Sequence, residues 1–344
     1  MKAMLLAGGL STRLYPLTKQ VPKPLVPLVG EPNAGQVMRY LHTFGIDDVV
    51  MNVFYLADQI VAAFGDGSRY GVQLRYLHEK NLTGSAGAVK QMQAFFQDGT
   101  FVVVGCDGVT DSKLDELIAF HRERKAIATI GLLEAPVVDQ FGVVVLDDAG
   151  RIQEFQEKPK PGTEKSHLVN TGIYVFEPEI FEYIPADQFS DFGNDVFPAL
   201  LAAGQRFYGM HLSDAYWTDI GTLAEYRRAT EDVLSGRLVL PGAPPIRIPA
   251  SANIAESARV GPCVAIGERV SIAEGVVIEG PSVIGDDVHV AKNAAIRQSI
   301  LFARASVGAT SVVADSILGL GYVVGEDEWI QDAVMGYDAV PTPA

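Results

Sequence analysis

The sequence predicts an α/β domain with a mixed, mostly parallel sheet, followed by a left-handed parallel β-helix. Three observations lead to this prediction. Strand-like and helix-like segments alternate over about the first 230 residues, and the first strand runs into a Gly-Gly pair at Gly8 and Gly9. From Ile254 to Ile296, Ile or Val then recurs at every sixth position.

The α/β part follows from the order of its segments. Short apolar runs rich in β-branched residues predict strands, and apolar residues spaced three and four apart predict helices. Strands are expected at 2–7, 49–55, 72–77 and 101–104, and helices at 57–64, 86–96 and 114–124. Such alternation favours parallel strands, whose ligand crevice lies beyond their carboxyl ends. The loop after Ala7 and the acidic turn after Val104 should open onto that crevice.

The β-helix follows from the strict period of six, which neither a helix nor a single strand produces. Its anchors are Ile254, Val260, Ile266, Ile272, Ile278, Ile284, Val290 and Ile296. Small or β-branched residues stand four positions after most anchors, as in a hexapeptide-repeat prism whose anchors point inward. A stretch rich in Pro and Gly precedes the repeat. We expect the α/β domain at 1–236, a linker at 237–250 and a β-helix at 251–344.

Composition limits the classes of function. The 344 residues include 42 acidic and 27 basic side chains, a net charge of −15, which argues against binding to nucleic acid or to an anionic membrane. Two distant cysteines, Cys106 and Cys263, suggest neither a disulfide framework nor a zinc cluster. The chain lacks an apolar run of about 18 residues and a secretory leader, so a cytoplasmic protein is expected.

The glycine loop after the first strand is suited to phosphate, because backbone N–H groups can point at an anion there. It fits neither the dinucleotide fingerprint G-x-G-x-x-G nor the Walker pattern. Two cations follow it, Arg13 and a Lys23 that stands between two prolines. A guanidinium fork and an ammonium point charge together suit a polyphosphate.

These motifs resemble those of the sugar-1-phosphate nucleotidyltransferases, also called nucleotide-sugar pyrophosphorylases. The N-terminal pattern G-G-x-x-T-R-L-x-P-L-T followed by P-K-P resembles the family signature. The further matching segments, in family order, are LTGSAGAV at 82–89, VVVGCDGVTD at 102–111, FGVVVLDDAGRIQEFQEKP at 141–159, VNTGIYVFEP at 169–178 and YWTDIGTLAEY at 216–226. The resemblance is closest to the mannose-1-phosphate guanylyltransferase-like group, some members of which use UTP and glucose 1-phosphate. It implies the Rossmann-like nucleotide-diphospho-sugar transferase fold.

The resemblance also implies an activity and a set of site residues. A nucleoside triphosphate and a hexose 1-phosphate would give a nucleotide sugar and pyrophosphate, with GTP and mannose 1-phosphate or UTP and glucose 1-phosphate as leading pairs. Arg13 and Lys23 would be catalytic, and Asp107 and Asp219 would hold Mg2+. The implied nucleotide-binding residues are Leu6, Ala7, Gly8, Gly9, Glu79, Gly84 and Ser85, and the implied sugar-phosphate-binding residues are Gly142, Glu157, Lys158 and Asn170.

Two departures from the family pattern keep alternatives open. Ser11 replaces a glycine that tolerates positive φ, and the segment Asn33-Ala34-Gly35-Gln36 replaces the usual M-I-E stretch. A catalytically inactive regulatory subunit of the same fold is one alternative. The other is a bifunctional enzyme with acyltransferase activity, for which His289 would be the base, although its position beside anchor Val290 predicts an outward side chain. The β-helix is expected to assemble identical chains into an oligomer.

Overall fold

The computed structural model describes residues 1–336, which divide into two compact units. The first unit contains Met1–Gly9 and Ala34–Thr218, and the second contains Leu10–Asn33 and the chain from Asp219 onward. The glycine loop is therefore shared, with Gly8 and Gly9 in the first unit and Arg13 in the second. The last eight residues of the predicted β-helix domain, 337–344, lie outside the described residues.

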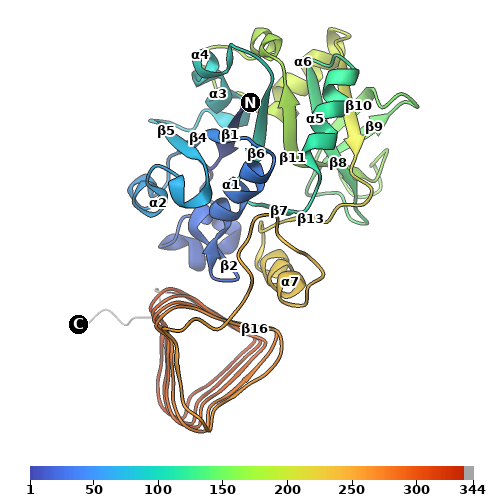
Figure 1. Ribbon diagram of the computed structural model, residues 1–344. Coiled ribbons are helices and arrows are strands. Elements are labelled where there is room, and N and C mark those ends of the chain that lie inside the picture. The colour runs from blue at the N-terminus through green and yellow to red at the C-terminus, as the bar shows by residue number, and fades with distance from the viewer. Residues whose placement is uncertain (337–344) are drawn as a thin grey trace, which may run out of the picture. The chain divides into compact units, whose positions relative to one another are not determined.

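A mixed sheet forms the centre of the first unit (Figure 1). Its strands are β1 (Lys2–Leu6), β4 (Asp48–Val53), β5 (Gln73–His78), β6 (Phe101–Gly105), β8 (Ala128–Glu134), β9 (Gly142–Leu146), β10 (Ile152–Glu157), β11 (Leu168–Phe176) and β12 (Phe207–His211). Strands β6, β1, β4 and β5 lie side by side and parallel, as the alternation of elements predicts. Strand β11 pairs antiparallel with β6, β8 and β9, and β12 pairs parallel with β8. A separate short pair consists of β7 (Gly108–Thr110) and β13 (Trp217–Asp219).

The predicted helices form where the apolar spacing places them. The helices are α1 (Asn33–Thr43), α2 (Ala57–Phe64), α3 (Gly84–Gln91), α4 (Gln93–Phe96), α5 (Leu114–Glu123), α6 (Phe197–Ala202) and α7 (Leu223–Leu234). Helix α5 buries Leu114, Leu117, Ile118 and His121, which lie on one face at a spacing of three and four. The helix expected at 86–96 divides into α3 and α4 at Met92, whose backbone leaves helical geometry. The hydrophobic core of this unit includes the buried rings of Phe101, Phe176, Phe192, Phe197 and Phe207.

The second unit contains three parallel sheets of short strands, the arrangement of a parallel β-helix. Figure 1 shows the coils following one another around a triangular outline. The first sheet contains β14 (Asn253–Ile254), β17 (Ser271–Ile272), β20 (His289–Val290), β23 (Ser306–Val307) and β26 (Val323–Val324). The second contains β15 (Arg259–Val260), β18 (Val277–Glu279), β21 (Ala295–Arg297), β24 (Val312–Ala314) and β27 (Trp329–Gln331). The third contains β16 (Val264–Ile266), β19 (Ser282–Ile284), β22 (Ile300–Leu301), β25 (Ile317–Leu318) and β28 (Val334–Met335). The same unit includes the hairpin of β2 (Pro27–Leu28) and β3 (Glu31–Pro32).

The anchors of the hexapeptide repeat form the core of the β-helix, as predicted. Ile278, Ile284 and Ile296 are at most 1% exposed. One coil takes 18 residues in the first part of the β-helix, where Asn253 lies beside Ser271 and Ser271 beside His289. One coil takes 17 residues in the later part, where His289 lies beside Ser306 and Ser306 beside Val323. The period of six therefore ends at Ile296 although the coils continue.

Among the described residues no helix is both long and apolar enough to cross a membrane.

Candidate active site

The first glycine of the loop lies against two buried polar side chains. The N–H of Ala7, which follows β1, donates to Oδ1 of Asn52 at 2.8 Å. A Cβ on Gly8 would lie 2.7 Å from both Nδ2 of Asn52 and Oε2 of Glu79, so only glycine fits without displacing them. A Cβ on Gly9 would meet nothing within 4 Å. Gly8 is thus required by close packing, whereas Gly9 is exposed and has no such packing constraint.

Glu79 follows β5 and is 8% exposed. Its Oε2 accepts from Asn52 Nδ2 at 2.6 Å, and its Oε1 accepts from the hydroxyl of Thr83 at 2.6 Å and from the N–H of Thr83 at 3.2 Å. These bonds fix the carboxylate between the end of β4 and the start of α3. Asn52 was missed by the sequence analysis, although a polar residue inside the apolar run VVMNVF was a usable signal.

Gly84 and Ser85 lie where α3 begins. Gly84 has φ +80°, and a Cβ there would lie 2.4 Å from the carbonyl oxygen of Ser190. Ser85 donates to Oδ1 of Asp191 through its N–H at 2.9 Å and its hydroxyl at 3.0 Å. The next two N–H groups of α3, those of Ala86 and Gly87, donate to Ser190 O. The first turn of α3 is therefore joined to the loop that contains Ser190 and Asp191.

Asp107 stands at the carboxyl end of β6, the strand beside β1. Cys106 donates its N–H to the carbonyl of Leu6 at 3.1 Å, so this turn lies directly beside the start of the glycine loop. Oδ1 of Asp107 lies 2.7 Å from the position that a Cβ on Gly105 would take. The carboxylate therefore turns back over Gly105, another position where a side chain would collide.

Glu157, at the end of β10, lies over two glycines. Its Oε2 is 3.2 Å from the Cβ position of Gly142 and 2.4 Å from that of Gly193. Burial raises the pKa of the Glu157 carboxyl, Lys158 opposes the rise, and Asp191 adds to it. Lys158 has φ 45°, a left-handed backbone rarely adopted by a non-glycine residue, and lies 3.7 Å from Glu157. Its ammonium group remains largely exposed.

Asn170 is positioned by an irregularity in β11. The register of this strand against β8 shifts between Asn170 and Tyr174. Oδ1 of Asn170 accepts from the N–H of Gly172 at 2.9 Å, and its Nδ2 donates to the Tyr174 hydroxyl at 2.9 Å. Burial raises the pKa of Tyr174, and Glu157, Asp107 and Asp191 raise it further. Tyr174, which the sequence analysis quoted within a motif but did not select, therefore bonds to the predicted Asn170. It also lies within electrostatic reach of the predicted Glu157 and Asp107 and of Asp191, which was not predicted.

Arg13, Lys23 and Asp219 belong to the second unit. Arg13 is exposed in a single helical turn, Thr12–Leu14, and Lys23 begins another, Lys23–Leu25. Asp219 accepts the N–H of Gly221 at 3.1 Å through Oδ1. Ser11 has φ 53° and ψ 43°, so the serine adopts the left-handed conformation that the family pattern assigns to glycine. Its carbonyl accepts from the Thr18 hydroxyl at 2.7 Å.

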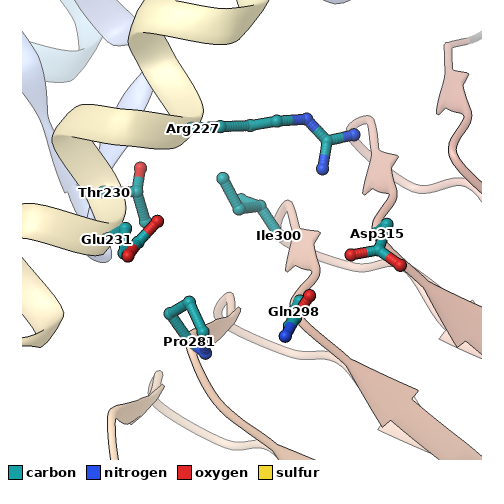
Figure 2. A pocket seen from close by; sticks show the side chains of 7 residues that line it. All are labelled: Arg227, Thr230, Glu231, Pro281, Gln298, Ile300 and Asp315. Carbon is teal, nitrogen blue, oxygen red and sulfur yellow. The ribbon is translucent and has the colours of Figure 1, made fainter.

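His289 is exposed on β20, as its position beside an anchor predicts. The cavity shown in Figure 2, about 260 Å³, lies elsewhere in the second unit, between α7 and the β-helix. It is lined by Arg227, Thr230, Glu231, Pro281, Gln298, Ile300 and Asp315, none of which the sequence analysis selected. Burial lowers the pKa of Arg227, and Asp332 and Asp315 oppose this. The wall of this cavity therefore carries one cationic side chain, Arg227, and two acidic ones, Glu231 and Asp315.

The chain is similar to known nucleotidyl transferases. Residues 2–236 match the nucleotidyl transferase family. A UTP--glucose-1-phosphate uridylyltransferase from Synechocystis sp. is 38% identical over 345 residues, covering 94% of this chain and 88% of that protein. Mannose-1-phosphate guanylyltransferase 1 from Arabidopsis thaliana is 28% identical, covering 100% of this chain and 96% of that protein. A Bacillus anthracis crystal structure named "putative glucose-1-phosphate thymidylyltransferase" is 27% identical with a TM-score of 0.61, covering 67% of this chain and 94% of that one.

Proposed function

This chain belongs to the nucleotidyl transferase family, and we propose that it transfers a nucleotidyl group from a nucleoside triphosphate to a hexose 1-phosphate. In this reaction a phosphate oxygen of the sugar 1-phosphate forms a bond to the α-phosphorus. The bond from that phosphorus to the bridging oxygen breaks, and pyrophosphate leaves with the electron pair. Such a transfer depends on positioning and on neutralising charge rather than on covalent catalysis by the protein.

One observation carries the proposal. Glu79 follows β5, the Ala7–Gly9 loop follows β1, and Asp107 follows β6, and these strands belong to one parallel run. The carboxyl ends of parallel strands share one edge of the sheet, which is where ligands bind in such folds. The candidate base-side, phosphate-side and metal-side groups therefore lie along a single edge.

The proposed roles follow the chemistry of each residue. Lys23 binds the α-phosphate region, and Arg13 binds the pyrophosphate that leaves. The Gly8–Gly9 loop offers its backbone to the triphosphate. Glu157 and Asn170 bind sugar hydroxyls, Lys158 binds the sugar phosphate, and Gly142 allows a close approach. The raised pKa of Glu157 is consistent with a carboxyl that is shielded from water and can form a hydrogen bond with a sugar hydroxyl.

We further propose that Asp107 and Asp219 hold Mg2+. The donor chemistry fits, because Mg2+ prefers carboxylate oxygens and is commonly bound by one or two carboxylates together with substrate phosphates. Among the described residues no group of three or more His, Cys, Asp or Glu side chains forms a self-sufficient metal cage. When bound, the ion supplies positive charge that offsets the charge of the phosphates.

Two substrate pairs are proposed as leading. UTP with glucose 1-phosphate is supported by the 38% identity to the Synechocystis uridylyltransferase. GTP with mannose 1-phosphate is supported by the guanylyltransferase relative and by Glu79. A carboxylate only accepts hydrogen bonds, and guanine presents adjacent N–H donors, whereas the single N–H of uracil lies between two carbonyls. The domain boundaries at 236 and 250, and a homo-oligomer formed through the β-helix, belong to the same proposal.

The proposal is tested by measuring pyrophosphate release with Mg2+ for each of several nucleoside triphosphates against several hexose 1-phosphates. We expect release with at least one pair that contains UTP or GTP. Absence of release with every pair would favour the alternative of an inactive regulatory subunit. Transfer of an acetyl group from acetyl-coenzyme A that is lost in His289→Ala would favour the bifunctional alternative.

A further inference from the structure

Asn52 connects two segments of the proposed nucleotide site by opposite ends of one side-chain amide. Its Oδ1 accepts from the N–H of Ala7, and its Nδ2 donates to Oε2 of Glu79. Asn52 is 4% exposed, Glu79 8% and Ala7 6%. Both bonds are therefore shielded from water, where losing one partner is costly.

The direction of this amide is fixed by its neighbours. The N–H of Ala7 is only a donor, so it requires the oxygen of the amide, and the NH2 group is left to face Glu79. Oε2 of Glu79 accepts at this contact and requires that NH2 group. Asparagine satisfies both partners at once. Aspartate would satisfy the N–H but place a second carboxylate against Glu79, and alanine would satisfy neither.

The chain of bonds extends beyond Asn52 on both sides. Oε1 of Glu79 holds Thr83, the residue before α3, through the hydroxyl and the N–H. On the other side Gly8 packs against the hydrogen bond between Asn52 and Glu79. A Cβ on Gly8 would lie 2.7 Å from each of the two bonded atoms. A shift of Asn52 is thus transmitted to the glycine loop, to Glu79 and to the start of α3.

From this geometry we propose that Asn52 is a positioning residue for the nucleoside triphosphate: it holds the glycine loop and Glu79 in one fixed relation. The inference rests on the proposed function, because it assumes that the loop and Glu79 bind the triphosphate. Asn52 itself need not touch the substrate.

The test uses binding as well as turnover. The dissociation constants of UTP and GTP with Mg2+ are measured by titration calorimetry, and KM for both substrates is measured with the better pair. The variants are Asn52→Asp, Glu79→Gln, the double variant Asn52→Asp/Glu79→Gln, Asn52→Ala and the control Asn81→Asp. Asn81 is exposed between Glu79 and Thr83, so its substitution adds the same charge nearby without touching the bonded chain.

We expect Asn52→Asp to weaken triphosphate binding at least about tenfold and to leave KM for the hexose 1-phosphate within about twofold. Glu79→Gln alone should also weaken triphosphate binding, because it places two NH2 groups against each other and removes the carboxylate. The double variant restores a donor facing an acceptor and should bind more tightly than additive losses of the two single variants predict. Asn52→Ala, which adds no charge, should also weaken triphosphate binding and carries the test should Asn52→Asp not fold.

Three outcomes would overturn the inference: unchanged triphosphate binding in a folded Asn52 variant, an equal loss in Asn81→Asp, or fully additive losses in the double variant. A lower melting temperature with unchanged KM would mean a purely structural role. If wild type binds a triphosphate but releases no pyrophosphate, the proposed function fails and the inference is still decided by binding. If wild type binds no triphosphate, both fail.

Discussion

The side chain of Asp191 holds Ser85 by two hydrogen bonds to one oxygen, from the N–H at 2.9 Å and from the hydroxyl at 3.0 Å. The two residues are 106 positions apart. Through this contact the first turn of α3, on the proposed base side, is joined to the loop beside Glu157, on the proposed sugar side. The contact between Asp191 and Ser85 therefore links the two halves of the proposed substrate site in the first unit.

Removing that connection should destabilise the first unit. Asp191→Ala leaves the part-buried N–H of Ser85 without its acceptor, so we expect a loss of about 1–3 kcal/mol in the free energy of unfolding. A double-mutant cycle with Ser85→Ala should give a coupling of about 1 kcal/mol, measured by urea unfolding. Additive effects of the two substitutions would mean that the residues act independently.

Gly84→Ala should lower the free energy of unfolding far more than Gly204→Ala does. Gly84 and Gly204 both have positive φ, but only at Gly84 would a Cβ collide with backbone, 2.4 Å from Ser190 O. Gly204→Ala should cost about 1 kcal/mol, and Gly84→Ala at least about 2 kcal/mol more. The comparison is made by thermal unfolding. Equal costs would show that the loop of Ser190 moves away without penalty.

Ser11→Gly should be tolerated. The left-handed backbone of Ser11 costs a residue with a Cβ about 1 kcal/mol, while glycine has a more flexible unfolded chain, so the two terms nearly cancel. Ser11→Val, with a branched Cβ, should lose about 1–2 kcal/mol or more. The bond from Thr18 is to the backbone and remains in both variants. Equal unfolding midpoints for the Gly and Val variants would contradict the assigned conformation.

His121 should make stability fall in mild acid. It is 1% exposed, with Nδ1 2.8 Å from the Thr129 hydroxyl, and burial lowers its pKa although Glu177 opposes the shift. Below about pH 6.5 the unfolded chain then binds more protons than the folded protein. The stability that neutral His121 contributes is therefore full above that pH and declines below it. Relative to His121→Gln, wild type should lose unfolding free energy between about pH 7.5 and about pH 5.5. Parallel curves would mean that His121 binds a proton equally well in both states.

The anchors of the β-helix should carry its stability. Ile296 is fully buried, and truncation to alanine should cost about 2–5 kcal/mol. Val323 belongs to the same β-helix but is 67% exposed, and Val323→Ala should change stability by less than about 0.5 kcal/mol. Comparable losses in the two variants, measured by chemical unfolding, would contradict the assignment of inward and outward positions.

Local patterns predicted much of the fold and less of the site. Helix α2 spans Ala57–Phe64 as its spacing predicts, and the anchors up to Ile296 are inward. A β-helix was expected to reach residue 344, but its anchors beyond Ile296 were not identified, because the spacing to the next anchor, Leu301, is five. Asn52 and Asp191 were missed for a different reason. Their roles depend on partners in distant segments, Ala7 and Ser85, and a single sequence does not show which strand ends and loops meet.

The most direct measurement of nucleotidyl transfer is steady-state pyrophosphate release by wild type, Lys23→Ala, Asp107→Ala and the control Lys80→Ala, with the best substrate pair and Mg2+. Lys80 is an exposed cation beside Glu79 with no proposed role. Because Lys23 and Asp107 are assigned to the charge that develops during transfer, each substitution should lower kcat at least about 100-fold, while Lys80→Ala stays within about threefold. No release by wild type with any pair, or unchanged kcat in both folded variants, would contradict the proposed function.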